Sequence, residues 1–190
     1  NGNGELEIAT SPDGVNVVVA LQSRRWVSSN DGGATFPNSG RIGQGNGDPS
    51  VAWGQSGKFY QAYIDNSGSC GNGIYLNPVV APDLFPPAGP DPTPNGMDCT
   101  GFARSDDNGV TFNTNVVNPA VVCIGSAPSG SPPNPGECFP DQEHIAADRW
   151  NPGDTANDDQ VYSTWRDFDQ FDQDAAIVCS SDSGVTWTAP

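Results

Sequence analysis

The stretch Ser105-Asp106-Asp107-Asn108-Gly109-Val110-Thr111-Phe112 is the most informative part of this chain, because its pattern occurs three times. The pattern is Ser-x-Asp-x-Gly-x-Thr-aromatic, and we call it the box. Its aspartates lie 76 and 75 residues apart, and this even spacing indicates three copies of one structural unit. The repeated positions are Ser29, Asp31, Gly33, Thr35 and Phe36; Ser105, Asp107, Gly109, Thr111 and Phe112; and Ser180, Asp182, Gly184, Thr186 and Trp187.

The chemistry of the box predicts a turn between two β-strands. Its Asp can accept hydrogen bonds from backbone N–H groups of the turn, and its Gly can adopt the positive φ that other residues resist. The Thr and the aromatic residue then begin the next strand, with the aromatic ring packed inward. We therefore expect Asp31, Asp107 and Asp182 to be structural, and Phe36, Phe112 and Trp187 to be core residues.

The segments around each box predict four short strands per unit. First strands are expected at 5–10, 48–53 and 141–148, and second strands at 15–21, 59–64 and 160–165. A third strand leads into each box and a fourth leaves it, which makes an antiparallel meander. Repeated four-stranded meanders are the blades of an all-β propeller.

The boxes resemble the Asp-boxes, or BNR repeats, of sialidases and their non-enzymatic relatives. This resemblance implies a sialidase-like β-propeller, which usually has six blades, so that this chain supplies about three. The expected division of the single segment 1–190 is blade 1 at about 1–47, blade 2 at about 48–118, a loop at 119–140, and an incomplete blade 3 at about 141–190. We expect further blades from a longer chain or, alternatively, from other chains.

Composition limits the partners and the compartment. With 23 acidic and 7 basic residues the net charge is -16, which disfavours nucleic acid and anionic membranes, and no stretch is apolar enough to span a membrane. The five cysteines lack the close pairs of a zinc site, so we expect a secreted or cell-surface protein with disulfides. The expected bridges are Cys123–Cys138 and Cys70–Cys99, and Cys179 is expected as a buried thiol in a strand.

One face of the predicted propeller is the default binding site. Loops before the first strands and after the second strands share the face opposite the boxes, and loops on one face of a rigid scaffold commonly bind ligands. The charged residues expected on this face are Arg24, Arg25, Asp48, Asp65, Asp141, Glu143, Arg166, Asp167 and Asp169.

Catalytic residues are not identified by the resemblance. Sialidases use an arginine triad, an acidic acid/base residue and a Tyr nucleophile assisted by Glu, and the early arginine signature of the family is absent here. A carboxylate pair for glycoside hydrolysis could come from Asp48, Asp141 and Glu143, but solvated carboxylates are the simpler interpretation. The lone histidine, His144, is expected to be packed in its strand.

No cofactor is required by this sequence. Calcium is a possible ligand of the acidic loops 154–159 and 167–172. Two functions remain: a non-catalytic extracellular module that binds protein or glycan or serves as a scaffold, which the sequence favours, and a secreted sialidase-like exo-glycosidase completed by residues outside this chain.

Overall fold

The computed structural model describes residues 4–22, 25–42, 48–55, 57–65, 99–112, 139–148, 159–168 and 173–187. Its secondary structure consists of ten strands. They are β1 (Leu6–Thr10), β2 (Val17–Leu21), β3 (Arg25–Ser29), β4 (Asn38–Arg41), β5 (Ser50–Trp53), β6 (Phe59–Asp65), β7 (Cys99–Ser105), β8 (Phe139–Asp148), β9 (Gln160–Phe168) and β10 (Gln173–Ser180). None of the described segments forms a helix that could cross a membrane.

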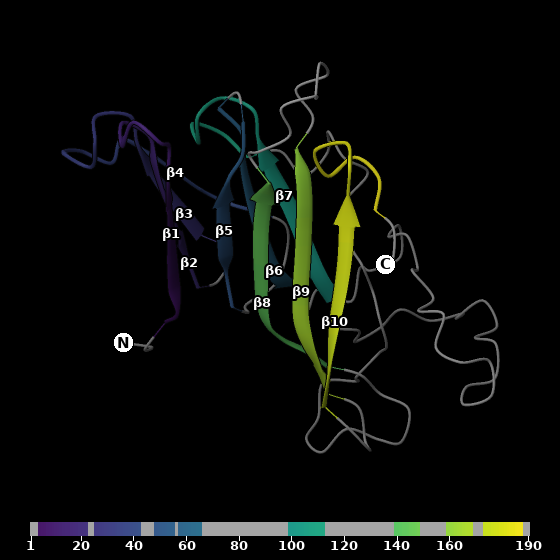
Figure 1. The fold of residues 1–190 in the computed structure, drawn as a ribbon. Coiled ribbons are helices and arrows are strands. Elements are labelled where there is room, and N and C mark those ends of the chain that lie inside the picture. The colour runs from purple at the N-terminus through teal and green to yellow at the C-terminus, as the bar shows by residue number, and fades with distance from the viewer. Residues whose placement is uncertain are drawn as a thin grey trace, which may run out of the picture.

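The strands form three antiparallel sheets, each built from consecutive strands in meander order (Figure 1). The first sheet is β1-β2-β3-β4, the second β5-β6-β7, and the third β8-β9-β10. The first, second and third strands expected from the sequence are all present, and a fourth strand, β4, follows the first box. The fourth strands expected after the other two boxes fall outside the described residues. The all-β fold of open antiparallel sheets is confirmed, and it is that of a partial propeller.

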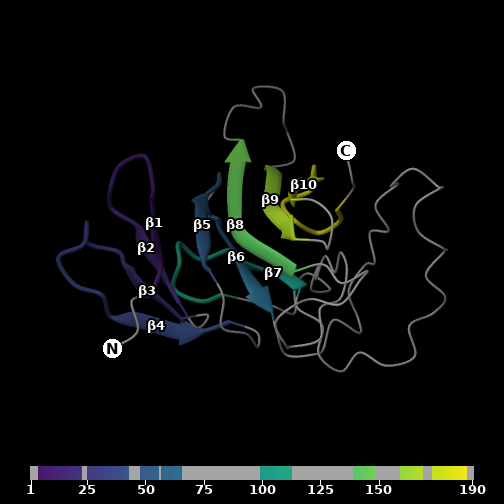
Figure 2. The same ribbon diagram turned by 90° about the horizontal axis from the view of Figure 1, so that it is seen from below.

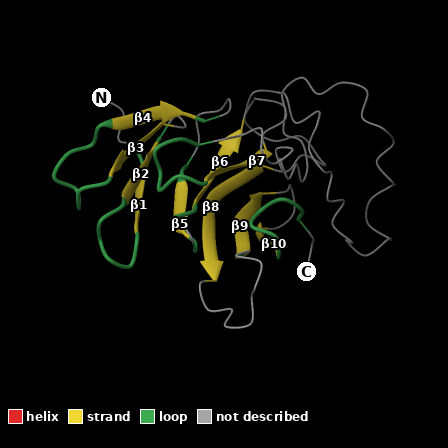
Figure 3. Cartoon of the chain, turned by 90° about the horizontal axis from the view of Figure 1, so that it is seen from above, coloured by secondary structure: helices red, strands yellow, loops and turns green. Residues whose placement is uncertain are grey.

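The three sheets lie side by side (Figure 2), and their first strands are neighbours. β1 contacts β5, and β5 in turn contacts β8. The first strands therefore form one continuous inner wall of the partial propeller. Figure 3 shows them from the side opposite to Figure 2. We call the end at which these strands begin the entry end; the boxes lie at the other end, beyond β3, β7 and β10.

Each box is closed by the same set of hydrogen bonds. In the second box, Asp107 accepts hydrogen bonds from Ser105 Oγ at 2.8 Å, Thr111 N at 2.8 Å and Thr111 Oγ1 at 2.6 Å. Ser105 Oγ accepts one from Gly109 N at 2.9 Å, and Gly109 has a φ of 82°. The first and third boxes repeat this geometry residue for residue. The turn is thus held by side chains of the box itself.

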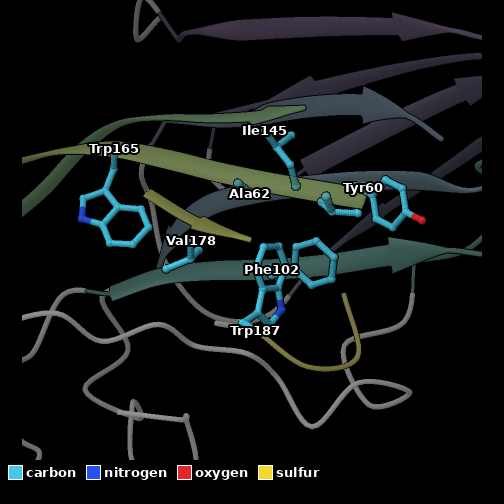
Figure 4. Close-up of a cluster of buried hydrophobic side chains, with 8 residues drawn as sticks. Tyr60, Ala62, Phe102, Ile145, Trp165, Val178 and Trp187 are labelled. Atoms are coloured by element: carbon cyan, nitrogen blue, oxygen red, sulfur yellow. The ribbon is translucent and has the colours of Figure 1, made fainter. Parts of the chain in front are cut away.

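Each later box also packs on the preceding sheet. The Phe112 ring lies 5.2 Å from that of Trp26 on β3, and the Trp187 ring lies 4.9 Å from that of Phe102 on β7. Figure 4 shows Trp187 and Phe102 in the largest core cluster, together with Tyr60, Ala62, Ile145, Trp165 and Val178. The boxes therefore join neighbouring blades.

Phe36 corrects the expectation that every box aromatic is a core residue. Trp187 is 4% exposed and Phe112 is partly buried, but Phe36 is 44% exposed. The reason is positional, because Phe112 and Trp187 each cover the sheet that precedes their own. Phe36 belongs to the first sheet, and no described sheet precedes it.

Replacement of Asp107 by Ala is expected to lower the free energy of unfolding by roughly 1 to 3 kcal/mol, because two donors on Thr111 and one on Ser105 lose their acceptor. Chemical denaturation measures this loss. Asp148→Ala, at an exposed position at the end of β8, is the control and should change stability much less. Equal stability of Asp107→Ala and the unmodified chain would contradict the structural role of the box aspartate.

Candidate binding site

Acidic side chains from three neighbouring sheets meet at the entry end of the inner wall. Glu5 directly precedes β1, Asp48 precedes β5, and Asp141 and Glu143 belong to β8. The Asp48 carboxyl lies close enough to those of Glu5 and Asp141 to raise the pKa of both. We call Glu5, Asp48, Asp141 and Glu143 the acid cluster.

A hydrogen-bonded chain fixes the three first strands relative to one another beside this cluster. The Glu7 carboxylate accepts hydrogen bonds from Ser50 Oγ at 2.7 Å and from Val51 N at 3.1 Å. Ser50 Oγ accepts one from Ile145 N at 3.0 Å. The side chains of Glu7 and Ser50 therefore join β1, β5 and β8. These hydrogen bonds fix the positions of the strands that carry the acid cluster.

A β-bulge places Glu143 in the interior. In the β8–β9 pairing, Asp141 is opposite Arg166 and His144 is opposite Thr164, so β8 carries one extra residue between these pairs. Gln142, in the bulge, has a φ of 56°, an unusual value for a residue other than glycine. Gln142 and His144 are exposed, whereas Glu143 is only 2% exposed. Neither carboxyl oxygen of Glu143 has a hydrogen-bond partner among the described residues.

Burial and mutual repulsion raise the pKa values of Glu143, Glu5 and Asp141. Burial raises the pKa of Glu143 to about 8, its own backbone amide offsets part of this, and Asp48, Asp141 and Glu5 raise it further. The negative charge of Asp48 is the main cause of a raised pKa at Glu5. Burial is the main cause at Asp141, where Asp48 adds to the shift and Arg166 opposes it. A positive charge brought into this site would relieve the repulsion.

The cluster borders a hollow of about 400 Å³, lined by Glu5, Leu6, Glu7, Asp48, Pro49, Gln142, Glu143 and His144. Four of these lining residues are acidic, and no arginine or lysine is among them. Within the described part of the chain, no group of three or more His, Cys, Asp or Glu side chains has an arrangement suited to a metal ion. The acidic lining gives the hollow a negative charge wherever these carboxyl groups are ionised.

The structure brings together only part of the predicted binding face. Asp48, Asp141 and Glu143 converge, and Arg166 lies opposite Asp141. Arg25 is exposed at the start of β3, where it pairs with Leu21 and Arg41, outside the lining of the hollow. Arg24, Asp169 and the side chains of Asp65 and Asp167 fall outside the described residues, as do Cys70, Cys123, Cys138 and the side chain of Cys99.

Glu5 and Glu7 are site residues that the sequence analysis missed. An alignment of the three repeated units would have indicated Glu5. It stands at the start of the first strand of its blade, as Asp48 and Asp141 do in theirs. The expectation that His144 is packed is wrong, since its side chain is 69% exposed and its Nδ1 lies 3.6 Å from Glu7 Oε1. The bulge explains this, because it turns Glu143 inward and leaves His144 on the surface.

Asp159, the last residue of the acidic loop 154–159, is buried and hydrogen-bonded within the protein rather than exposed to solvent. It is fully buried and accepts hydrogen bonds from Gln55 N at 2.9 Å and from the Tyr60 hydroxyl. Burial, and then this bond to Asp159, raise the pKa of Tyr60. These contacts cross from the third sheet to the second, so Asp159 joins two blades. The remainder of the acidic loop 154–158 lies outside the described residues.

Comparisons with known proteins bear on the fold. No protein-family model matches the chain, and no match is found among curated proteins. Among solved structures, the chain is similar to a Hadza microbial sialidase, Hz136, at 16% identity and a TM-score of 0.49, over 97% of this chain and 36% of that one. It is also similar to YCF48 bound to D1 peptide, at 12% identity and a TM-score of 0.42, over 100% of this chain and 43% of that one.

The fold of the described residues is that of a partial β-propeller. Three antiparallel meanders with neighbouring first strands, each followed by the same closed turn, carry this assignment. The chain spans less than half the length of both similar structures.

Proposed function

We propose that this chain is a non-catalytic, extracellular propeller module that binds a ligand carrying positive charge, such as a basic peptide segment, at the entry end. The observation that supports this most strongly is the acidic hollow of about 400 Å³. The segments of all three first strands, β1, β5 and β8, contribute carboxyl groups to it. The opposite end of the same strands offers a hollow of similar size lined by Ala9, Thr10, Ser11, Pro12, Ala52, Trp53, Ala146 and Ala147, none of which is charged. Charge therefore distinguishes the entry end.

The physical basis of binding is relief of repulsion. The negative charge of Asp48 raises the pKa of both Glu5 and Asp141, so the arrangement is unfavourable when all three groups are ionised. An ammonium or guanidinium group placed among them would form charge-assisted hydrogen bonds and offset the repulsion between these carboxylates. Rigid support by the Glu7–Ser50 contact reduces the ordering that binding requires.

The test is calorimetric titration with pentalysine, with pentaglutamate as the probe of opposite charge. We expect the chain to bind pentalysine and not pentaglutamate. Salt should weaken the affinity for pentalysine, and the Asp48→Asn variant should bind it at least fivefold more weakly. Asp148→Asn, at the box end of β8, is the matched control and should bind like the unmodified chain. Absence of pentalysine binding, or equal affinities of the two variants, would refute the proposal.

Glycoside hydrolysis is a second candidate because of one observation, the raised pKa of Glu143 beside two further acids. A carboxyl group that stays protonated near neutral pH can act as a general acid, with a neighbouring carboxylate as base or nucleophile. The acidic lining opposes an anionic sugar, however, and Glu143 is buried.

We therefore expect this chain to show no turnover of a fluorogenic sialoside or of neutral aryl glycosides. Fluorescence release measured at pH 5 and at pH 7 checks this. Turnover that is lost in Glu143→Gln and kept in Asp148→Asn would establish the hydrolase instead.

The extracellular compartment proposed here depends on the cysteines. We expect bridges Cys123–Cys138 and Cys70–Cys99, because each would close a Pro- and Gly-rich segment that has little capacity to form its own core. Mass spectrometry of unreduced peptides identifies the linkages. A linkage between the two pairs, or five reduced cysteines in the secreted protein, would contradict this expectation.

A further inference from the structure

Both junctions between neighbouring sheets are built in the same way. The receiving sheet presents two residues at fixed distances before its own box, Trp26 and Ser28 on β3, and Phe102 and Arg104 on β7. The aromatic of the next box covers the first of these, at ring distances of 5.2 and 4.9 Å. The second donates a hydrogen bond to a box carbonyl, Ser28 Oγ to Gly109 O at 2.6 Å and Arg104 Nη1 to Ser183 O at 2.8 Å.

The first strand of the next sheet completes each junction. Val51 on β5 packs in one cluster with Val18 and Ala20 of the preceding sheet. Ile145 on β8 packs in the equivalent cluster with Tyr60 and Ala62. The strand registers make these two sets equivalent, because Val18 pairs with Ser28 and Tyr60 pairs with Arg104.

The third sheet presents a receiving face that none of the described boxes covers. At the positions of Phe102 and Arg104 it has Ile177 and Cys179, and at the positions of Tyr60 and Ala62 it has Tyr162 and Thr164. Ile177 is 43% exposed and Tyr162 is 37% exposed, whereas Phe102 and Tyr60 are buried. Within the described segments, the third sheet therefore has the residues of a junction but no box packed on them.

The first sheet presents the matching donating face. Ile8, at the position of Val51 and Ile145, is 64% exposed, and Phe36 is the exposed box aromatic. A Cβ added at Gly109 or Gly184 would overlap a side chain of the preceding sheet, but one added at Gly33 would meet nothing within 4 Å. The two halves of one junction thus lie open at opposite sides of the same chain.

We propose that these two faces pack on each other between two copies of the chain, which close into a ring of six blades. Phe36 of one copy would cover Ile177 of the other, Gly33 would approach Cys179, and Ile8 would pack against Tyr162 and Thr164. None of these residues is charged, so the contact avoids the repulsion expected between two chains of net charge -16. Six blades lie within the range that propellers adopt, and a contact between unlike faces closes when its rotation completes a ring.

Sedimentation equilibrium of the purified chain at micromolar concentration tests this proposal. The expected species is twice the chain mass of 19.8 kDa. Ile177→Asp and Phe36→Asp should each weaken association at least tenfold while the circular dichroism spectrum is kept. Val110→Asp is the control, because Val110 is 38% exposed within the second box and belongs to neither face.

Mixing the two variants tests the geometry of the contact. A mixed pair has one junction in which both faces are unmodified, so Ile177→Asp mixed with Phe36→Asp should form dimers that neither forms alone. A monomeric unmodified chain, which would leave these faces to blades of a longer chain, overturns the proposal. So do open-ended polymers, or a dimer that is insensitive to both substitutions.

Discussion

Gly109→Ala is expected to lower the free energy of unfolding by roughly 2 to 5 kcal/mol. The φ of 82° at this position costs about 1 to 2 kcal/mol for a residue with a Cβ, and overlap with the Val18 side chain adds about 1 to 3 kcal/mol. Chemical denaturation followed by circular dichroism measures the loss. The effect is large because the substitution changes both the turn and the junction between two sheets.

Gly33→Ala is the matched control for this prediction. Gly33 occupies the same box position with a φ of 87°, and a Cβ there meets nothing within 4 Å. We expect a loss of only about 1 to 2 kcal/mol from the backbone alone. Gly184→Ala, in contact with Phe102, should resemble Gly109→Ala. Equal losses at Gly33 and Gly109 would show that the second box does not pack on the first sheet as described.

Glu143→Gln is expected to stabilise the protein at neutral and alkaline pH. The folded-state pKa of about 8 lies above the ordinary value of 4.5, so the protonated carboxyl is favoured by folding. This contribution is complete below about pH 4.5 and is lost as the pH rises through about 8, by up to about 5 kcal/mol in total. The glutamine is neutral throughout and should remove most of this dependence.

Thermal unfolding at pH 5 and pH 8 measures the effect. The unmodified chain should be less stable at pH 8, and the difference should be much smaller in Glu143→Gln. Asp148→Asn, which removes an exposed carboxyl from the same strand, should keep the pH dependence of the unmodified chain. A pH dependence that is the same in Glu143→Gln would contradict the buried, protonated state of Glu143.

The fold could be predicted because its determinants are local. The box carries its own hydrogen-bond donors and acceptors, so Ser105, Asp107, Gly109 and Thr111 define the turn wherever the chain places it. The second strands β2 and β6, with the sequences VVVAL and FYQAYID, are rich in β-branched and aromatic residues, which favours strands over helices. Strand order then follows because strands consecutive in the sequence tend to be neighbours in a sheet.

The site could be predicted only in part, because it depends on contacts between distant segments. The sequence indicated that Asp48, Asp141 and Glu143 share a face, and they do converge. It did not indicate the bulge at Gln142, which separates buried Glu143 from exposed His144. Similarly, Phe36 is exposed because no described sheet precedes the one to which its box belongs. Which sheet a box covers depends on the packing of the blades and cannot be read from the motif.

The most direct test of this account is a double-mutant cycle between Gly109→Ala on the second sheet and Val18→Ala on the first. The central claim is that each box packs on the sheet before it, and the Gly109–Val18 contact represents this junction. Because Val18→Ala removes the methyl groups that the new Cβ would overlap, we predict that the two losses of unfolding free energy add to more than the loss in the double variant, by at least about 1 kcal/mol. Additive losses would contradict the claim.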